Sequence, residues 1–392
     1  MATEIVQPIS IEQWQRERVH FCNDSKHEKR GQKTDRSIKN YTQLEDLTSS
    51  IETSLCDIMR KALQSLIVLS LMTSVASANS REVRVYSGRH YNTDRQVFKQ
   101  FSQETGIKVR LIEATGISLV ERLKREGSNS KADVILLVDA ARINNAAEAN
   151  LLQPISSQEL VKNIPSNYRD PSNRWFGLTR RVRSIIINPN KVKPGLISTY
   201  ADLAKPELRN KLCLRKRNNV YNQSLVADQI VLKGEKQTSQ WVKDMIKNVS
   251  QPFYSGDVSL IRAVGQGKCG AAIVNHYYFA RVKAGSSGSK DQKLAANIKH
   301  IMPNPAHVNI SAAGVAKSAQ NKGEAIELIE YLASPKGSKA LSAPTYEYPL
   351  RGTSTSKTLQ DLGAFKPDGV SISKLGSTQK SAVRMMAASG WQ

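Results

Sequence analysis

Tyrosine recurs where the chain is predicted to turn from a strand into a helix. Three apolar segments that are typical of strands are each followed by tyrosine, and the residues concerned are Tyr91, Tyr221, Tyr277 and Tyr278. The carboxyl ends of the strands in an open α/β sheet are where such sheets bind ligands. We therefore expect the four phenol side chains to face one common site.

Four phenols at one site have the chemistry to bind a hard metal cation. A phenol titrates near pH 10 and is normally neutral. Bound Fe³⁺ reverses this preference, because a highly charged cation stabilises the phenolate. Four phenolates and a neutral imidazole, which His90 could supply, would leave Fe³⁺ in a site with a charge of about −1. Fe²⁺ stays open as the ion in use, because nearby arginines could also favour it together with some neutral phenols.

Arginines stand close in sequence to these tyrosines and to the predicted crossing of the chain. Arg281 follows Tyr278 by three residues, and Arg180 and Arg181 lie in the extended segment 175–188. Such arginines would offset a negative site charge and hold the ligands through hydrogen bonds. Two alternatives stay open: the arginines clamp an anion bidentately while the tyrosines are idle, or the tyrosines are half-buried packing residues.

Strand and helix patterns alternate along residues 80–332, which is typical of α/β layers. The expected strands cover 83–87, 107–113, 132–138, a segment from 212 and 269–275, and the expected helices cover 93–105, 117–125, 224–232, 241–248 and 325–332. The continuous apolar run 132–138 favours a parallel sheet that is covered on both faces.

Extended segments at 175–188, and at 298–301 and 310–316, separate two strand–helix series. We expect two α/β lobes that are joined by two crossing strands, with the ligand in the cleft between them. Lobe 1 would comprise residues 79–178 and 303–350, and lobe 2 residues 179–302. Residues 351–392 would form a C-terminal helical segment that packs on the lobes.

Composition excludes several classes of protein. Hydrophobic residues make up 40% and charged residues 23% of the 392 residues, which is ordinary for a globular chain and not for a fibrous or disordered one. The net charge of +23 lies entirely in residues 79–392, because residues 1–78 hold ten residues of each sign. The cluster 215–217 is basic, but no nucleic-acid-binding module accompanies it. No nucleophile–base motif supports an enzyme.

Residues 59–78 have the pattern of a secretory signal peptide. Arg60 and Lys61 precede the apolar run 62–75, and Ala76-Ser77-Ala78 matches an A-x-A cleavage site. We therefore expect export to the periplasm with cleavage near Ala78. Residues 1–58 are polar and precede this signal, so the sequence predicts a mis-assigned, disordered extension with the true start at Met59.

Cysteine use is sparse in the part of the chain that follows the predicted signal peptide. Cys213 and Cys269 are its only cysteines, and the C-x-x-C spacing of a zinc or redox motif is absent. In an oxidising compartment the two could form a disulfide. They could equally be two buried thiols, because sequence spacing does not fix the distance between them.

Several motifs resemble those of the periplasmic ferric iron-binding proteins of iron ABC importers, particularly the cyanobacterial Fut-type branch. They are residues 85–91 (VYSGRHY), 175–181 (WFGLTRR), 218–221 (NNVY), 275–281 (NHYYFAR) and 344–349 (PTYEYP). The resemblance covers roughly residues 80–392. The paired tyrosines after an asparagine, together with the His-Tyr pair at the first turn, are its most specific features.

The resemblance implies a bilobed class II periplasmic substrate-binding protein that binds iron and performs no chemical turnover. Its ligands would be Tyr91, Tyr221, Tyr277 and Tyr278, with His90 as a ligand in some members only. Arg181 and Arg281 would lie just outside the ligands, and a synergistic anion could complete the coordination. The expected partners are the permease and ATPase of an iron ABC transporter, the protein itself being a monomer that could also contact a membrane surface.

Overall fold

The computed structural model describes residues 81–89, 91–250, 252–352, 354 and 356–392, which belong to a single unit, Ser80–Gln392. The predictions for residues 1–58 and 59–78 lie outside these residues, as does the ligand predicted at His90. Among the residues described, no helix combines the length and the apolar character needed to cross a membrane.

The first three strands of the sheet are parallel to one another. They are β1 (Glu82–Ser87), β2 (Lys108–Glu113) and β3 (Val134–Val138), and β1 pairs with both of the others. The helices that follow them are α3 (Asp94–Thr105), α4 (Gly116–Glu126) and α5 (Ala140–Glu148). Local side chains set the helix starts, since Thr115 accepts a hydrogen bond from the Ser118 N–H and Asp139 accepts one from the Ala141 N–H.

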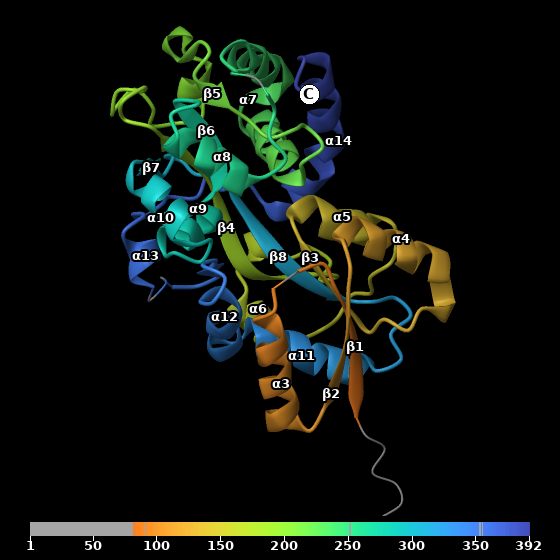
Figure 1. Cartoon of the computed structure of the whole chain (residues 1–392). Coiled ribbons are helices and arrows are strands. Elements are labelled where there is room, and N and C mark those ends of the chain that lie inside the picture. Colours follow the sequence, from red (N-terminus) through yellow and green to blue (C-terminus); the bar gives the residue numbers. More distant parts are fainter. Residues whose placement is uncertain (1–80, 90, 251, 353, 355) are drawn as a thin grey trace, which may run out of the picture. The chain divides into compact units, whose positions relative to one another are not determined.

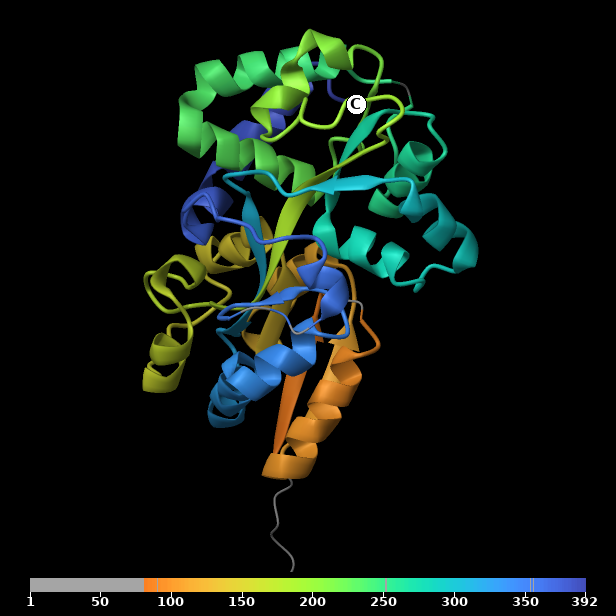
Figure 2. The ribbon, with the colours of Figure 1, turned by 90° about the vertical axis from the view of Figure 1, so that its left-hand side faces the viewer.

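Two long strands connect the two series of strands and helices. They are β4 (Phe176–Ile187) and β8 (Val308–Val315), which run side by side through the middle of the chain's fold (Figures 1 and 2). They pair antiparallel with each other, and the order of strands is β2-β1-β3-β8-β4-β6-β5. The expected crossing strands are therefore confirmed as elements, and both are buried apart from Arg180.

The sheet is mixed and not wholly parallel. β3 pairs in parallel with β1, but its other neighbour is β8, which runs antiparallel to it. The prediction of a parallel sheet around residues 132–138 is thus correct on one side of β3 and wrong on the other. An apolar run shows that a strand is buried on both faces, and every residue of β3 is buried, but it carries no information on the direction of its neighbours.

The second series contains three further paired strands and four α-helices. Its strands are β5 (Leu212–Cys213), β6 (Ala271–Asn275) and β7 (Lys299–Ile301), and its helices are α7 (Val220–Lys247), α8 (Asp257–Gly265), α9 (His276–Lys283) and α10 (Ser289–Ala296). Two helices were expected at 224–232 and 241–248, and they are the two halves of α7. Gly234 breaks the helical backbone between them with φ 78° and ψ 165°, a conformation that glycine adopts without steric cost.

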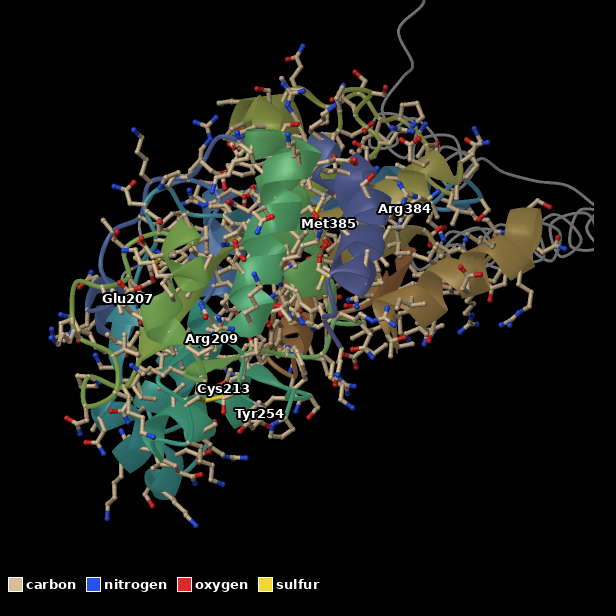
Figure 3. All side chains as sticks on the ribbon, turned by 90° about the horizontal axis from the view of Figure 1, so that it is seen from above. Glu207, Arg209, Cys213, Tyr254, Arg384 and Met385 are labelled. Carbon is tan, nitrogen blue, oxygen red and sulfur yellow. A yellow bond between two sulfur atoms is a disulfide. The ribbon has the colours of Figure 1, made fainter. Side chains whose placement is uncertain are left out.

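The C-terminal part of the chain covers elements of both series. Its helices are α11 (Lys322–Ala333), α12 (Pro335–Ser342), α13 (Lys357–Gln360) and α14 (Ile372–Ala388), and its strand is β9 (Tyr348–Pro349). α14 packs along α7 and also contacts α5 (Figure 3). The short remaining helices are α6 (Gln158–Asn163), η2 (Gly127–Asn129), η3 (Ser166–Tyr168), η4 (Ala201–Ala204) and η5 (Pro206–Leu208).

The apolar core follows the sheet. All residues of β3, β6 and β8 are buried. Helices contribute their apolar stripes, such as Phe98 and Phe101 from α3 and Leu328 and Leu332 from α11. Burial of these apolar side chains is the main favourable term in folding. The packed core holds the strand ends from which the site residues project.

Candidate functional site

Each of the four tyrosines lies just beyond the carboxyl end of a strand. Tyr91 follows β1, and its carbonyl accepts a hydrogen bond from the Asp94 N–H at 2.9 Å, which starts α3. Tyr221 lies in the first turn of α7, which follows β5. Tyr277 and Tyr278 lie in the first turn of α9, which begins directly after β6. Local sequence alone therefore places all four at strand-to-helix turns.

The phenol groups of these turns meet one another. The Tyr277 hydroxyl donates to the Tyr221 hydroxyl at 3.5 Å, and the Asn275 amide donates to the Tyr277 hydroxyl at 3.4 Å. The rings of Tyr277 and Tyr278 lie 4.4 Å apart between centroids. Tyr91 is close enough for its charge to raise the pKa of Tyr277. We call these four residues the tyrosine cluster.

Burial shapes the protonation of the tyrosine cluster. It raises the pKa of Tyr277, which is 1% exposed, well above the ordinary value, and neighbouring phenols raise that pKa further. Burial likewise raises the pKa of Tyr91 and brings the pKa of Tyr278 to about 12. These three phenols are therefore neutral near pH 7, and a cation that binds them as phenolates must displace their protons.

Four guanidinium groups lie against two of the tyrosine rings. Arg89 lies 4.9 Å and Arg281 5.7 Å from the ring centroid of Tyr91. The ring of Tyr221 is similarly approached by Arg181 at 5.5 Å and by Arg215 at 5.8 Å. Each guanidinium remains charged at any physiological pH. The tyrosine cluster is thus surrounded by fixed positive charge, which favours negative charge on the phenol oxygens.

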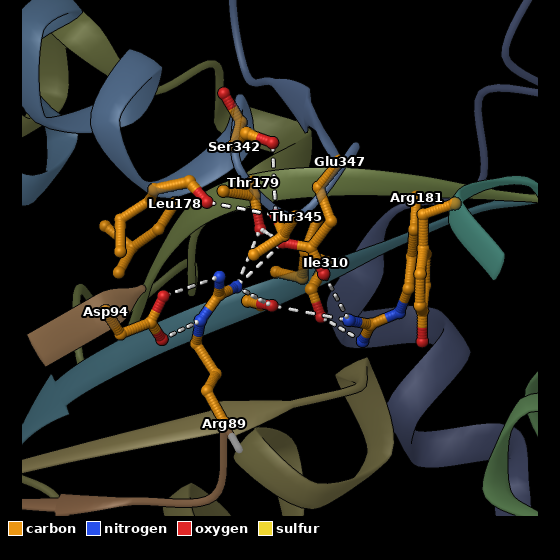
Figure 4. A network of polar contacts seen from close by, with 12 residues as sticks. Arg89, Asp94, Leu178, Thr179, Arg181, Ile310, Ser342, Thr345 and Glu347 are labelled. Atoms are coloured by element: carbon orange, nitrogen blue, oxygen red, sulfur yellow. Dashed lines mark hydrogen bonds and ion pairs between the residues drawn. The ribbon is translucent and has the colours of Figure 1, made fainter. Parts of the chain in front are cut away.

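A buried network of ion pairs holds Arg89 and Arg181 in place (Figure 4). Arg89 donates to Asp94 at 2.7 Å and to Glu347 at 2.8 Å, and both Arg89 and Glu347 have fully buried side chains. Arg181 lies 3.6 Å from the other oxygen of Glu347 and donates to the Ile310 carbonyl. Hydrogen-bonded networks of this kind in a low dielectric medium fix the positions of their members.

A second buried carboxylate, Asp257, orients the turns that carry the other tyrosines. It pairs with Arg183 and with Arg215, each at 3.0 Å, and accepts a hydrogen bond from the Asn275 N–H at 2.8 Å. Arg183 also donates to the Asn222 side chain, one residue after Tyr221. One carboxylate therefore ties the start of α7 to the end of β6, which sets Tyr221 and Tyr277 at hydrogen-bonding distance.

The structure brings most of the predicted site residues together but not all of them. Tyr91, Tyr221, Tyr277, Tyr278, Arg181 and Arg281 meet at one place. Arg180 points elsewhere: it donates to the Pro349 and Gly352 carbonyls and lies over the Phe365 ring. Neighbouring residues of a strand face opposite sides of the sheet, so Arg180 and Arg181 could not both reach the cluster. His90 lies outside the described residues.

Sequence reasoning missed several residues that shape the site. Arg89 stands inside a motif that was noted for its tyrosine, and Arg215 was considered only as part of a basic cluster. Glu347 stands inside the motif 344–349 but was not singled out, and Asp257 carried no signal, because a lone acidic residue is ordinarily exposed. Their burial beside arginines is visible only in the folded chain.

Cys213 and Cys269 are joined by a disulfide (Figure 3). The bond connects the end of β5 to the residue two positions before β6, which pair in parallel. It closes a loop of 56 residues that contains Tyr221 and Asp257. Of the two alternatives that the sequence left open, the structure has the bridge.

Comparisons with known proteins find solute-binding proteins. The family model for bacterial extracellular solute-binding proteins matches residues 87–339. The chain is 40% identical over 317 residues to iron uptake protein A1 of Synechocystis, covering 80% of this chain and 88% of that protein. It is 30% identical to the major ferric iron-binding protein of Neisseria meningitidis, covering 82% and 97%.

Solved structures give the same result. The chain superposes with a TM-score of 0.76 on a Trichodesmium protein in complex with iron and citrate ligands, at 41% identity, covering 79% of this chain and 100% of that one. A ferric binding protein from Campylobacter jejuni superposes with a TM-score of 0.74 at 34% identity, covering 79% and 100%.

Proposed function

The chain belongs to the family of bacterial extracellular solute-binding proteins, and we propose that it captures ferric iron with four tyrosines and delivers it to an ABC-type membrane permease. The α/β periplasmic binding protein fold that the resemblance implies is confirmed by the superposition on solved relatives. The observation that carries the proposal is the convergence of the tyrosine cluster among four arginines.

The phenol oxygens are the donors in this proposal. Tyr91, Tyr221, Tyr277 and Tyr278 bind iron as phenolates, and His90, adjacent to Tyr91 in the chain, adds a nitrogen donor. Hard cations favour oxygen ligands of this kind. Iron is the cargo of the protein, which binds and releases it without catalysing a reaction.

The arginines balance the charge that four phenolates bring. Arg89 and Arg281 act on Tyr91, while Arg181 and Arg215 act on Tyr221. Carboxylates already hold Arg89, Arg181 and Arg215 in position, so these charges need little rearrangement when iron arrives. Outer groups that orient ligands in this way commonly change metal affinity by 10- to 100-fold when they are removed.

An anion that joins the iron would bind at Arg281. Among the described residues, Arg281 forms no ion pair, unlike the other three arginines. Capture of an anion without iron is the weaker alternative. Arg180 is engaged with backbone carbonyls and Arg181 with Glu347, so two of the three arginines that were predicted to clamp such an anion are occupied.

The family and its relatives support a partner and a place of action for this chain. Solute-binding proteins of this family work with the permease and ATPase of an ABC importer, and periplasmic relatives favour the same compartment for this chain. We infer that the protein is exported by the signal at 59–78, is cleaved near Ala78 and acts as a monomer. The positive charge of residues 79–392 suits contact with an anionic membrane surface.

A visible absorption spectrum tests the proposal. Ferric iron added to chelator-treated protein should produce a phenolate-to-iron charge-transfer band. Tyr277→Phe and Tyr278→Phe should each shift or weaken this band and lower the affinity for iron at least about tenfold. Tyr331→Phe is the matched control, because Tyr331 lies on α11 and its hydroxyl has no hydrogen-bond partner among the described residues.

Two outcomes would contradict the proposal. The first is the absence of any charge-transfer band with ferric iron. The second is a band that Tyr277→Phe and Tyr278→Phe change no more than Tyr331→Phe does. Calorimetric binding of citrate or phosphate in the absence of iron, lost in Arg281→Gln, would instead favour the anion alternative.

A further inference from the structure

Three side chains with metal-binding donor atoms meet outside the tyrosine cluster. Asp228 lies in α7, His307 directly precedes β8, and Asp368 lies between α13 and α14. Each residue offers one donor atom, and these atoms all lie within 4.8 Å of one another. The three residues come from separate parts of the chain, and neither the predicted site nor the proposed function uses them.

These side chains present polar atoms without partners. Asp228 is fully buried and His307 is 1% exposed. Among the described residues, Asp228 Oδ1, Asp368 Oδ2 and both ring nitrogens of His307 are buried and form no hydrogen bond. Asp228 Oδ1 and His307 Nδ1 are only 3.2 Å apart, but they are not aligned for a hydrogen bond. Buried polar groups nearly always have a partner, so four together need an explanation such as an ion.

The other oxygen of each carboxylate is already engaged. Asp228 Oδ2 accepts a hydrogen bond from the Gln229 amide at 2.9 Å, and Asp368 Oδ1 accepts one from the Val370 N–H at 3.0 Å. The Asp368 N–H donates to the Ala306 carbonyl at 3.1 Å, which fixes Asp368 beside His307. These contacts orient the carboxylates and leave one oxygen of each for a shared partner.

Charge and donor type identify that partner. Two carboxylates bring two negative charges, and in the described part of the chain neither pairs with a lysine or arginine. A protonated His307, 3.2 Å from Asp228, would offset one of these charges at most. Unpaired charge is costly to bury, and a divalent cation would neutralise it. One imidazole nitrogen with two carboxylate oxygens suits Zn²⁺ and similar transition metals, whereas Ca²⁺ and Mg²⁺ favour sites made of oxygen alone.

We propose that Asp228, His307 and Asp368 bind a divalent transition-metal ion, separate from the tyrosine cluster. The ion connects α7, the start of the crossing strand β8 and the segment that leads into α14. Because α14 packs on both α7 and α5, a cation here holds the C-terminal helix against elements of both series. The site has a structural role and does not depend on the proposed transport of iron.

Zinc binding by the full chain tests this proposal. Metal-free protein is titrated with Zn²⁺ in competition with a chromophoric chelator. Asp368→Asn removes one ligand from a half-buried position with little change in shape. We expect it to weaken the binding of one equivalent of Zn²⁺ at least about tenfold, and to abolish the rise in Tm that Zn²⁺ gives the unmodified protein.

Matched variants separate this site from other zinc ligands. Asp361→Asn makes the same chemical change at an exposed carboxylate near the end of α13 and should leave zinc binding unchanged. Tyr277→Phe should also retain this equivalent of zinc. His307→Gln should lose it, and Asp368→Asn decides the question if His307→Gln fails to fold. Equal zinc affinity in Asp368→Asn and Asp361→Asn would overturn the proposal, as would loss of the equivalent in Tyr277→Phe alone.

Discussion

Replacement of Glu347 by glutamine should destabilise the protein far more than loss of an ordinary surface charge. The Glu347 side chain is fully buried and lies 2.8 Å from Arg89 and 3.6 Å from Arg181. Glutamine keeps the size of the side chain but removes its charge, which leaves Arg181 without an ion-pair partner among the described residues. Asp94 still pairs with Arg89.

The magnitude follows from which charges remain buried. Removal of one partner from a buried ion pair costs about 3–5 kcal/mol. Because Asp94 continues to neutralise Arg89 in Glu347→Gln, we expect the free energy of unfolding to fall by about 3 kcal/mol, the lower end of this range. Arg89→Met leaves both Asp94 and Glu347 without Arg89, so this variant should lose about 5 kcal/mol of unfolding free energy, the upper end of the range.

A double-mutant cycle measures the interaction itself. The combined variant Arg89→Met and Glu347→Gln no longer holds either member of the pair, so its loss should be smaller than the sum of the two single losses by up to about 3 kcal/mol. Urea unfolding of the iron-free protein, followed by tryptophan fluorescence, gives each free energy of unfolding. Trp175 and Trp391 are buried and serve as probes.

The matched control is Glu104→Gln. Glu104 lies 2.6 Å from Lys336, but both side chains are substantially exposed, and such pairs contribute at most about 1 kcal/mol. If Glu347→Gln costs no more than Glu104→Gln, the argument that buried charge fixes this network is refuted. Additive losses in the double-mutant cycle would show that Arg89 and Glu347 do not stabilise each other.

Three further predictions concern stability. Burial raises the pKa of Glu347, but the charges of Arg89 and Arg181 outweigh this and hold the pKa below its ordinary range, so the stability that Glu347 contributes is present above about pH 4.3 and is lost as the pH falls through the lower folded-state pKa. The Tm of Glu347→Gln should therefore fall less steeply than that of the unmodified protein between pH 5 and 3. Parallel curves would count against this. Gly314→Ala places a Cβ 2.6 Å from the Arg174 carbonyl and should lower the free energy of unfolding in urea by about 1–3 kcal/mol. Gly323→Ala, in open space on α11, should be neutral or stabilising. Equal effects of the two substitutions would show that the backbone at Gly314 shifts to make room. Paired replacement of Cys213 and Cys269 by serine should lower the free energy of unfolding by about 2–5 kcal/mol, and an unchanged urea midpoint would mean that the disulfide adds no stability.

The order of elements could be predicted from the sequence because its signals are local. The strands at 83–87, 107–113, 132–138 and 269–275, and the helices at 93–105, 117–125 and 325–332, are confirmed to within a few residues at their ends. Apolar periodicity and turn residues act within about ten residues, so they can be recognised in the sequence without knowledge of the tertiary structure. The positions of all four tyrosines at strand-to-helix turns follow directly from that order.

The direction of neighbouring strands was beyond these local signals. β8 inserts between β3 and β4, so that a strand from the end of the fold lies next to one from its beginning. Its pattern predicts an extended, buried segment but not its partner. The two helices expected at 224–232 and 241–248 are confirmed by contrast, as the halves of α7 on either side of the break at Gly234.

The sequence by itself determined that this is an α/β chain with tyrosines gathered at its strand ends. Only the tertiary structure decided what surrounds them. Arg89 meets Glu347 across 258 residues of chain, Arg183 meets Asp257 across 74, and His307 lies beside Asp228. Such contacts depend on burial and on the closure of long loops, which no local pattern encodes. A charged residue in a sequence is therefore ambiguous until the fold shows which opposite charge it is buried against.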